Sequence, residues 1–279
     1  MKRRPAHRAG TFYPSSAGEI AAQLASFASQ PLCGDRCFGA LVPHAGWGYS
    51  GRLAHAAFAR LASARPERVV LLGAVHVPGV VRPAIGEWDQ WEVPTGLLTI
   101  DREFEQSLLD AGAVERNRHA HVGEHSIEVQ LPIVVSLLGD VPVVPIAVPS
   151  RSSAIEVGEI LASLAGATTV VVASSDLTHY GEANYGFAPA GVGAAAVEWA
   201  RRNDERFLDC VRALDASGAL KDAREHRSAC GAGAVAAAIT FAARRGARRA
   251  EVLEHTTSLA VEGASRRGSF VGYAAAVFT

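Results

Sequence analysis

The chain has few of the features that mark whole classes of proteins. Its four cysteines, Cys33, Cys37, Cys210 and Cys230, form no close C-x-x-C pair and are too few for a disulfide-rich framework. A reducing compartment therefore fits best. The longest charge-free apolar stretch, residues 229–243, has about 15 residues, whereas a membrane-spanning helix needs about 20. We therefore expect no membrane partner.

The sequence also has no excess of charge of either sign. It contains 27 Lys and Arg against 28 Asp and Glu. The basic clusters at residues 2–4 and 244–249 are short and typical of a solvated surface, so no nucleic-acid partner is expected. Pro5, His7 and Gly10 follow the first cluster where a signal peptide would carry its apolar run. We therefore expect a cytoplasmic protein.

No linker, low-complexity tract or repeat divides the chain, and segments with strand and helix patterns alternate along it. This pattern predicts one α/β domain over residues 1–279, with a mainly parallel central sheet flanked by helices. Strands are expected at residues 38–42, 68–73, 141–148, 170–173, 250–257 and 270–278, and residues 88–99 are expected to be extended or to form a hairpin. Helices are expected after the capping box at Ser16, around Phe104, from Glu124 with a kink or restart at Pro132, and at residues 52–64, 154–164, 188–201, 204–214 and 230–243.

Polar side chains follow three of the expected strands. The β-branched run at residues 170–172 indicates a strand buried on both faces, and Asp176 and His179 come directly after it. His44 and His76 follow two earlier strands in the same way. In open α/β sheets, ligands bind beyond the carboxyl ends of the strands. We therefore expect these side chains to share a site.

Cys230 extends this set because it stands at the expected start of a helix, where the helix dipole favours a thiolate. Imidazole and thiolate are good ligands for iron, copper or zinc. Taken singly, each residue has a structural alternative. A histidine in a turn often serves as a hydrogen-bonding group, Cys230 could be a small buried apolar residue, and Asp176 could cap a helix.

A second pair of imidazole and carboxylate lies between these motifs. Glu124 and His125 are adjacent, and His125 and Glu128 are expected one helical turn apart on one face. These residues could line the pocket or orient a ligand histidine, as outer carboxylates often do, or form a surface ion pair. The remaining histidines are expected to be structural or exposed: His7, His55, His119, His121, His226 and His255.

Two common catalytic motifs are absent. The glycines of residues 46–51 do not have the G-x-G-x-x-G spacing of a dinucleotide site. Hydrolysis through Asp176 and His179 with Ser174 or Ser175 is disfavoured because G-x-S-x-G is missing.

Several of these segments together resemble the Memo family, called AmmeMemoRadiSam system protein B in prokaryotes. The resemblance rests on residues 43–51 (PHAGWGYSG), 72–78 (LGAVHVP), 124–128 (EHSIE), 174–181 (SSDLTHYG) and 230–231 (CG). It implies a fold similar to class III extradiol ring-cleaving dioxygenases, which hold non-haem Fe(II). Where many Memo proteins have two adjacent histidines after the second strand, this chain has only His76.

By this resemblance, His44, His76 and Cys230 are the implied metal ligands, and His179 with Asp176 is the implied acid/base pair. The thiolate replaces a dioxygenase glutamate and shifts the preference toward copper(I), zinc or thiolate-bound iron. We expect a redox metalloprotein or metal-dependent oxidoreductase with iron or copper, zinc being possible. The resemblance also implies AMMECR-type and radical SAM proteins as partners.

The alternative is a non-enzymatic adaptor that binds a phosphopeptide or another anionic partner in the same pocket. Memo relatives are linked to phosphopeptide binding and signalling, so the resemblance permits this function. Arg52 and the backbone amides of residues 46–51 could then contact the anion.

Overall fold

Alternating side chains along the central strands divide the apolar core in two. In strand β3 (Arg68–Gly73), Val69 and Leu71 belong to one buried cluster, whereas Val70 and Leu72 belong to the other. Successive side chains of a strand point to opposite faces of a sheet, so both faces are buried here. The structure is a computed structural model that describes residues 1–27, 36–262 and 268–279; Cys33 lies outside these ranges.

The strands of the main sheet run mostly parallel around β9, as the sequence predicts. β9 lies between β2 and β3 and is parallel to both, whereas β12 and β4 run antiparallel to their inner neighbours. Within the described residues the spatial order is β10 (His179–Tyr180), β12 (Phe270–Phe278), β2 (Gly39–Val42), β9 (Thr169–Ser174), β3, β8 (Val143–Ala147), β4 (Ala84–Ile85) and β7 (Glu115–Arg116), with β11 (Ala250–Thr257) paired to β12.

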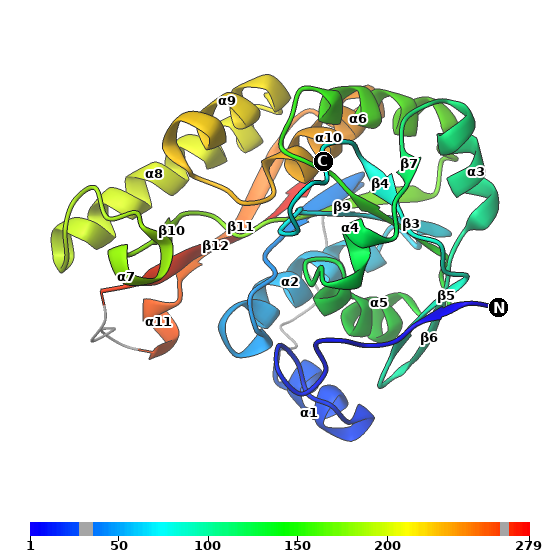
Figure 1. The fold of residues 1–279 in the computed structure, drawn as a ribbon, viewed down its shortest axis with the longest axis horizontal. Helices are drawn as coiled ribbons and strands as arrows, with labels where there is room; N and C mark the ends of the chain where they lie inside the picture. Colours follow the sequence, from blue (N-terminus) through cyan, green and yellow to red (C-terminus); the bar gives the residue numbers. More distant parts are fainter. Residues whose placement is uncertain (28–35, 263–267) are drawn as a thin grey trace.

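Helices cover both faces of this sheet (Figure 1). The helices on one face are α3 (Arg102–Asp110), α6 (Ser153–Leu164), α8 (Ala194–Arg212), α9 (Ala216–His226) and α10 (Ala232–Arg244). Those on the other face are α1 (Ala17–Phe27), α2 (Trp47–Ala62), the 3-10 turn η1 (Glu128–Gln130) and α5 (Leu131–Leu138). The fold is therefore a single α/β domain with a mixed, largely parallel sheet.

Smaller elements complete the fold. The expected hairpin is present as β5 (Gln90–Val93) and β6 (Gly96–Thr99), and β1 (Arg3–Arg4) adds a parallel strand to it. Short helices are α4 (His119–Val122), α7 (Glu182–Tyr185) and α11 (Leu259–Glu262). No helix in the described ranges is both long enough and apolar enough to cross a membrane.

Pro142 and Pro145 of the expected strand 141–148 suggest an edge or irregular strand, and the edge position is wrong. β8 lies between β3 and β4. The carbonyl of Pro142 accepts a hydrogen bond from the Val69 amide of β3. Because strand residues alternate in direction, Pro145 faces away from β3, so its missing N–H removes no hydrogen bond from that pairing.

Several helix limits also differ from the sequence-based expectations. Helix α2 begins at Trp47 rather than residue 52, because the Trp47 amide bonds to the carbonyl of Phe12 and the turn winds directly into the helix. The polar segment 217–228 is mostly helical, since Asp215 accepts the Gly218 amide at the start of α9. Residues 116–123, which are mostly polar, contain the short helix α4. A new helix, α5, does begin next to Pro132 as expected, and the proline occupies its first turn.

Helix α8 is one continuous helix where two are expected, at residues 188–201 and 204–214. The side chains of the polar residues at the expected break form hydrogen bonds with Thr178, outside the helix, and therefore do not end it. Asn203 Nδ2 donates to Thr178 Oγ1 at 2.9 Å, and the Thr178 amide donates to Asp204 Oδ1 at 3.0 Å. Helix α8 therefore holds the residue that precedes His179.

Asp204 also binds His255 on β11, and this contact should make stability depend on pH. His255 Nε2 lies 2.9 Å from Asp204 Oδ2, and its Nδ1 lies 3.2 Å from Glu205 Oε1. Burial opposes protonation, but the two carboxylates outweigh it and raise the pKa of His255. A raised pKa gives stability that is complete below the unfolded value of about 6.5 and is lost as the pH rises through the folded value.

We expect His255→Gln to lower the free energy of unfolding most at pH 6 and progressively less as the pH rises through the folded pKa of His255. Urea unfolding of both proteins across this range measures the difference. His119→Gln, at an exposed histidine, is the control and should change stability by about 0.5 kcal/mol or less. A loss for His255→Gln that is the same at every pH would contradict the linkage.

Candidate metal centre

Parallel strands deliver two of the predicted histidines to one edge of the sheet. In the strand register, Val42 of β2 lies beside Ser174 of β9, and Leu72 of β3 lies beside Ala173. His44 and His76 therefore leave their strands on opposite sides of the end of β9. The arrangement follows the rule that polar residues gather beyond the carboxyl ends of parallel strands.

A third histidine joins them. One nitrogen from each of His44, His76 and His125 lies within 4.8 Å of the others. The ring centroids are 5.2 Å apart for His44 and His76, 5.2 Å for His44 and His125, and 4.8 Å for His76 and His125. Imidazole nitrogens bind metals at about 2.0–2.1 Å. Small side-chain rotations would bring these nitrogens onto one ion, so the three residues could hold a metal.

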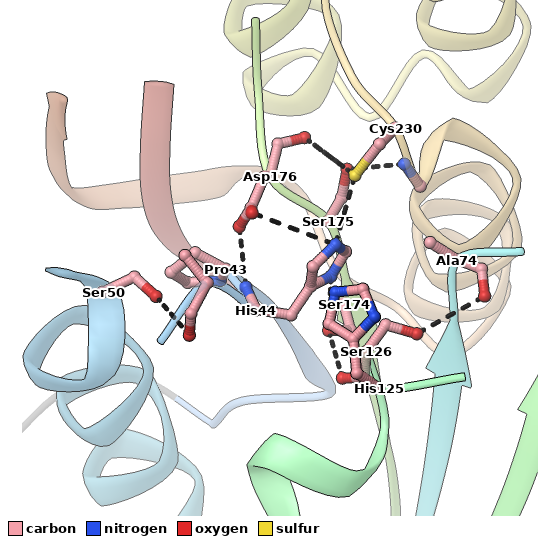
Figure 2. A network of polar contacts seen from close by, with 12 residues as sticks. Pro43, His44, Ser50, Ala74, His125, Ser126, Ser174, Ser175, Asp176 and Cys230 are labelled. Carbon is pink, nitrogen blue, oxygen red and sulfur yellow. Dashed lines mark hydrogen bonds and ion pairs between the residues drawn. The ribbon is translucent and has the colours of Figure 1, made fainter. Parts of the chain in front are cut away.

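The thiol of Cys230 lies beside this group, as Figure 2 shows. Its sulfur is 3.2 Å from His44 Nε2. The next residue, Gly231, lies so close to β9 that a Cβ there would stand 2.5 Å from the carbonyl oxygen of Ser174. A larger residue would push the start of α10 away. Cys210 and Cys230 are free thiols.

The carboxylate of Glu124 fixes the position of His76 through hydrogen bonds. Its carboxylate accepts the His76 amide at 2.7 Å and lies 2.9 Å from His76 Nδ1, and it also accepts the amides of His125 and Ser126, each at 2.9 Å. Burial disfavours its charge, but the bonds to His76 outweigh burial and lower the pKa of Glu124. The hydrogen bond at Nδ1 leaves Nε2 of His76 for another partner, the arrangement expected of a carboxylate that orients a ligand.

Burial keeps two of the imidazoles neutral, the form in which histidine binds metal. It lowers the pKa of His44 well below its ordinary value, and the charge of His76 adds to the effect. The same two causes lower the pKa of His125 to about 4. Burial also opposes the charge of His76, but the bonds and charges of Cys230 and Glu124 raise its pKa to about 10.

Asp176 and His179 lie next to the histidine group. Asp176 Oδ1 accepts the His44 amide at 2.7 Å, and burial raises the pKa of Asp176 to about 7. His179 Nδ1 lies 3.0 Å from the carbonyl oxygen of Leu177, which can only accept, so Nδ1 carries the proton and Nε2 is left as an acceptor. The ring of Tyr185 meets the His179 ring edge-on at 5.0 Å.

These residues line a cavity of about 420 Å³. Its described wall combines histidines, one carboxylate, hydroxyl groups and aromatic rings. The lining residues are Phe12, Ala45, Gly46, Tyr49, His125, Asp176, His179, Asn184, Tyr185, Ser258, Ser269, Phe270, Val271 and Tyr273. A small molecule in this cavity would contact His125 and His179 at once.

Glu128 has a different position from the one suggested by its spacing to His125. His125 precedes η1 in a turn, so the two side chains do not share a helix face. The carboxylate of Glu128 bonds to Arg4 at 2.6 Å, to the hydroxyl of Tyr13 at 3.1 Å, and to the amides of His7 and Arg8 at 2.8 and 2.6 Å. Both members of its ion pair with Arg4 are almost fully buried.

We call residues 4–13, held in this way, the N-terminal strap. The strap reaches the centre because the ring of Phe12 lies 4.8 Å from that of His125. Arg4 also donates to the backbone carbonyls of His121 and Glu124. Glu128 therefore supports His125 through the strap.

Residue types after strands reveal His44, His76, Asp176 and His179, but His125 follows no strand. Its adjacency to Glu124 is the signal that marks it, and that signal indicates a supporting role as readily as a ligand role. The Glu124 carboxylate brings His76 and His125 together in space. This contact between distant segments cannot be read from spacing.

The fold and these side chains define an α/β protein with a histidine group that could hold a metal ion. Residues 3–277 match the family model of Memo-like proteins, so the chain belongs to the Memo-like family. The likeness to class III extradiol dioxygenases and the name AmmeMemoRadiSam system protein B stay predictions.

Relatives of known sequence extend over the whole chain. A MEMO1 family protein of Methanosarcina acetivorans is 33% identical over 285 residues, which is 99% of each chain. MEMO1 family protein MK0963 of Methanopyrus kandleri is 34% identical over 298 residues, with 100% of this chain and 99% of that protein covered. The crystal structure of an uncharacterized protein, JW3007, from Escherichia coli K12 is similar with a TM-score of 0.54 and 13% identity, covering 88% of this chain and 100% of that one. That likeness concerns the fold alone.

The ion pair of Arg4 and Glu128 gives a test of the N-terminal strap. Removing one partner of a buried ion pair leaves an uncompensated charge and typically costs about 3–5 kcal/mol. We expect this loss for Glu128→Gln in urea unfolding. The matched control is Glu254→Gln, which breaks the exposed pair with Arg52 and should cost less than about 1 kcal/mol. Equal losses in the two variants would show that the strap is not held by this charge.

Proposed function

We propose that this protein binds one redox-active metal ion, iron or copper, and uses it in an oxidoreductase reaction within the cavity. The observation that carries the proposal is the convergence of three imidazoles and the Cys230 thiol beside a cavity whose wall includes His125. His44 and His76 are the proposed central ligands, with Cys230 and His125 completing the set. Zinc, which the same donors also bind, would supply no one-electron chemistry.

The chemistry of the donor set supports this choice. Imidazole suits iron, copper and zinc, and a thiolate adds preference for copper(I), zinc or thiolate-bound iron. A bound iron or copper ion would supply one-electron chemistry at the cavity. The outer contacts fit the same function, because Glu124 orients the ring of His76 and Asp176 holds the backbone of His44.

His179 and Asp176 are proposed to handle protons. Nε2 of His179 is an acceptor on a residue that lines the cavity, so it can take a proton from a substrate and return it. Asp176 has a pKa raised to about 7 by burial, which also suits proton exchange near neutral pH.

The phosphopeptide adaptor has less support. The Arg52 side chain pairs with Glu254. Three amides of residues 46–51 are also engaged within the chain, since that of Trp47 bonds to the Phe12 carbonyl and those of Tyr49 and Ser50 bond to the Gly46 carbonyl. Arg52 and these amides therefore already have partners within the chain. Phosphopeptide binding that survives complete removal of metal would favour the adaptor.

Metal binding by variants tests the proposed ligands. We expect wild-type protein, loaded anaerobically with Fe(II) or Cu(I), to hold about one ion per chain. His44→Gln and Cys230→Ser should bind the same ion at least about tenfold more weakly, because each removes a donor. Equilibrium dialysis with elemental analysis measures this. His119→Gln is the exposed control and should bind like the wild type. Unchanged affinity in both ligand variants would refute the assignment.

A second experiment separates proton transfer from metal binding. We expect His179→Gln to keep wild-type metal content and to lose about 10²–10⁴-fold in turnover, the usual contribution of a general acid or base. Oxygen consumption with ascorbate as the electron donor measures turnover, with hydrogen peroxide as the reduced product. Full activity in His179→Gln would remove His179 from the mechanism.

A further inference from the structure

A buried hydrogen-bond relay lies behind His44. It runs from the Gln130 amide to the Ser174 hydroxyl and on to Nδ1 of the His44 ring. The exposed fractions are 1% for Gln130, 2% for Ser174 and 1% for His44. Figure 2 shows Ser174 and Ser126 beside the His44 ring, on the side away from Cys230.

The distances determine the direction of each bond. Ser174 Oγ lies 2.7 Å from the carbonyl oxygen of Ser126, which can only accept, so the single hydroxyl proton of Ser174 points there. Gln130 Nε2 lies 3.2 Å from the same Oγ and can only donate. The oxygen of Ser174 is therefore left as an acceptor toward His44 Nδ1, 3.0 Å away. His44 must carry its proton on Nδ1.

The side-chain amide of Gln130 is itself fixed in orientation. Its Nε2 donates to the carbonyl oxygen of Pro43 at 2.8 Å. A flipped amide would place Oε1 against that carbonyl and against Ser174, whose proton is already engaged. In the observed orientation Oε1 is buried and has no hydrogen-bond partner. A buried acceptor without a partner is destabilising, so Gln130 stabilises this arrangement through the hydrogen bonds that its Nε2 donates.

We infer that Ser174, oriented by Gln130, is a positioning residue that fixes His44 in the Nδ1–H tautomer. This tautomer leaves the lone pair of Nε2 free on the side of Cys230 and of the other two histidines. The inference rests on the proposed function for its purpose, because only metal binding requires that lone pair. The tautomer itself follows from contacts within the chain.

The relay differs from the contact that orients His76. There the charged carboxylate of Glu124 accepts from Nδ1. Behind His44, the acceptor for Nδ1–H is the neutral hydroxyl of Ser174, whose own proton is donated to the Ser126 carbonyl. No charge is added next to the fully buried ring of His44, whereas the Glu124 carboxylate helps to raise the pKa of His76.

The tautomer of His44 can be observed directly by ¹⁵N NMR of the imidazoles in the metal-free protein. The His44 signals are identified by their disappearance in His44→Gln. We expect Nδ1–H in the wild type. In Ser174→Ala, Nδ1–H has no acceptor, and the ring should change to the Nε2–H tautomer, because the Cys230 sulfur at 3.2 Å can accept that proton. Metal affinity should then fall about 10- to 100-fold.

The control is Ser175→Ala. Ser175 is equally buried, and its hydroxyl contacts the Asp176 carbonyl, the Gly231 amide and, at 3.9 Å, the Cys230 sulfur, but it does not bond to an imidazole. It should lower stability and leave the tautomer of His44 unchanged. The inference would be overturned if His44 of the wild type carried its proton on Nε2. It would also be overturned if Ser174→Ala kept the Nδ1–H tautomer together with wild-type metal affinity. Failure of the wild type to bind metal would refute the proposed function and leave the tautomer result intact.

Discussion

The carboxylate of Glu124 is the contact on which the centre depends. It accepts from the backbone and ring of His76 and from the amides of His125 and Ser126, so it joins the end of β3 to the turn before η1. A buried carboxylate is costly unless such donors surround it. The donors it requires come from the segments that carry two of the three histidines. Satisfying one buried charge therefore assembles most of the site.

The fold could be predicted largely from local patterns, because continuous apolar runs mark the central strands, as a parallel sheet buried on both faces requires. The strand predicted at residues 170–173, the helix restart at Pro132 and the extended structure before α3 are all present, the last as a hairpin. The errors have physical causes. Pro145 suggests an edge position for β8, yet its missing N–H faces away from β3, and Asn203 with Asp204 suggests a break in α8 although both side chains bond to Thr178.

The candidate site could be predicted only in part, for a related reason. A single residue after a strand has a position that the fold fixes, and His44 and His76 meet as expected. The roles of His125 and Glu128 depend instead on which distant groups reach them. His125 is placed by Glu124 and by Phe12 of the N-terminal strap, whereas Glu128 binds Arg4. Sequence spacing alone predicts the same role for His125 and Glu128.

The end of β9 has a consequence for how the chain can vary. Ser174 faces His44 and Gln130, whereas the next residue, Ser175, faces the start of α10 and the Gly231 amide. Adjacent residues of an extended segment point to opposite sides, so the two serines serve different partners although they are chemically identical. Inserting or deleting one residue here would exchange their partners without changing the composition. The length of this segment is therefore constrained more tightly than its residue types.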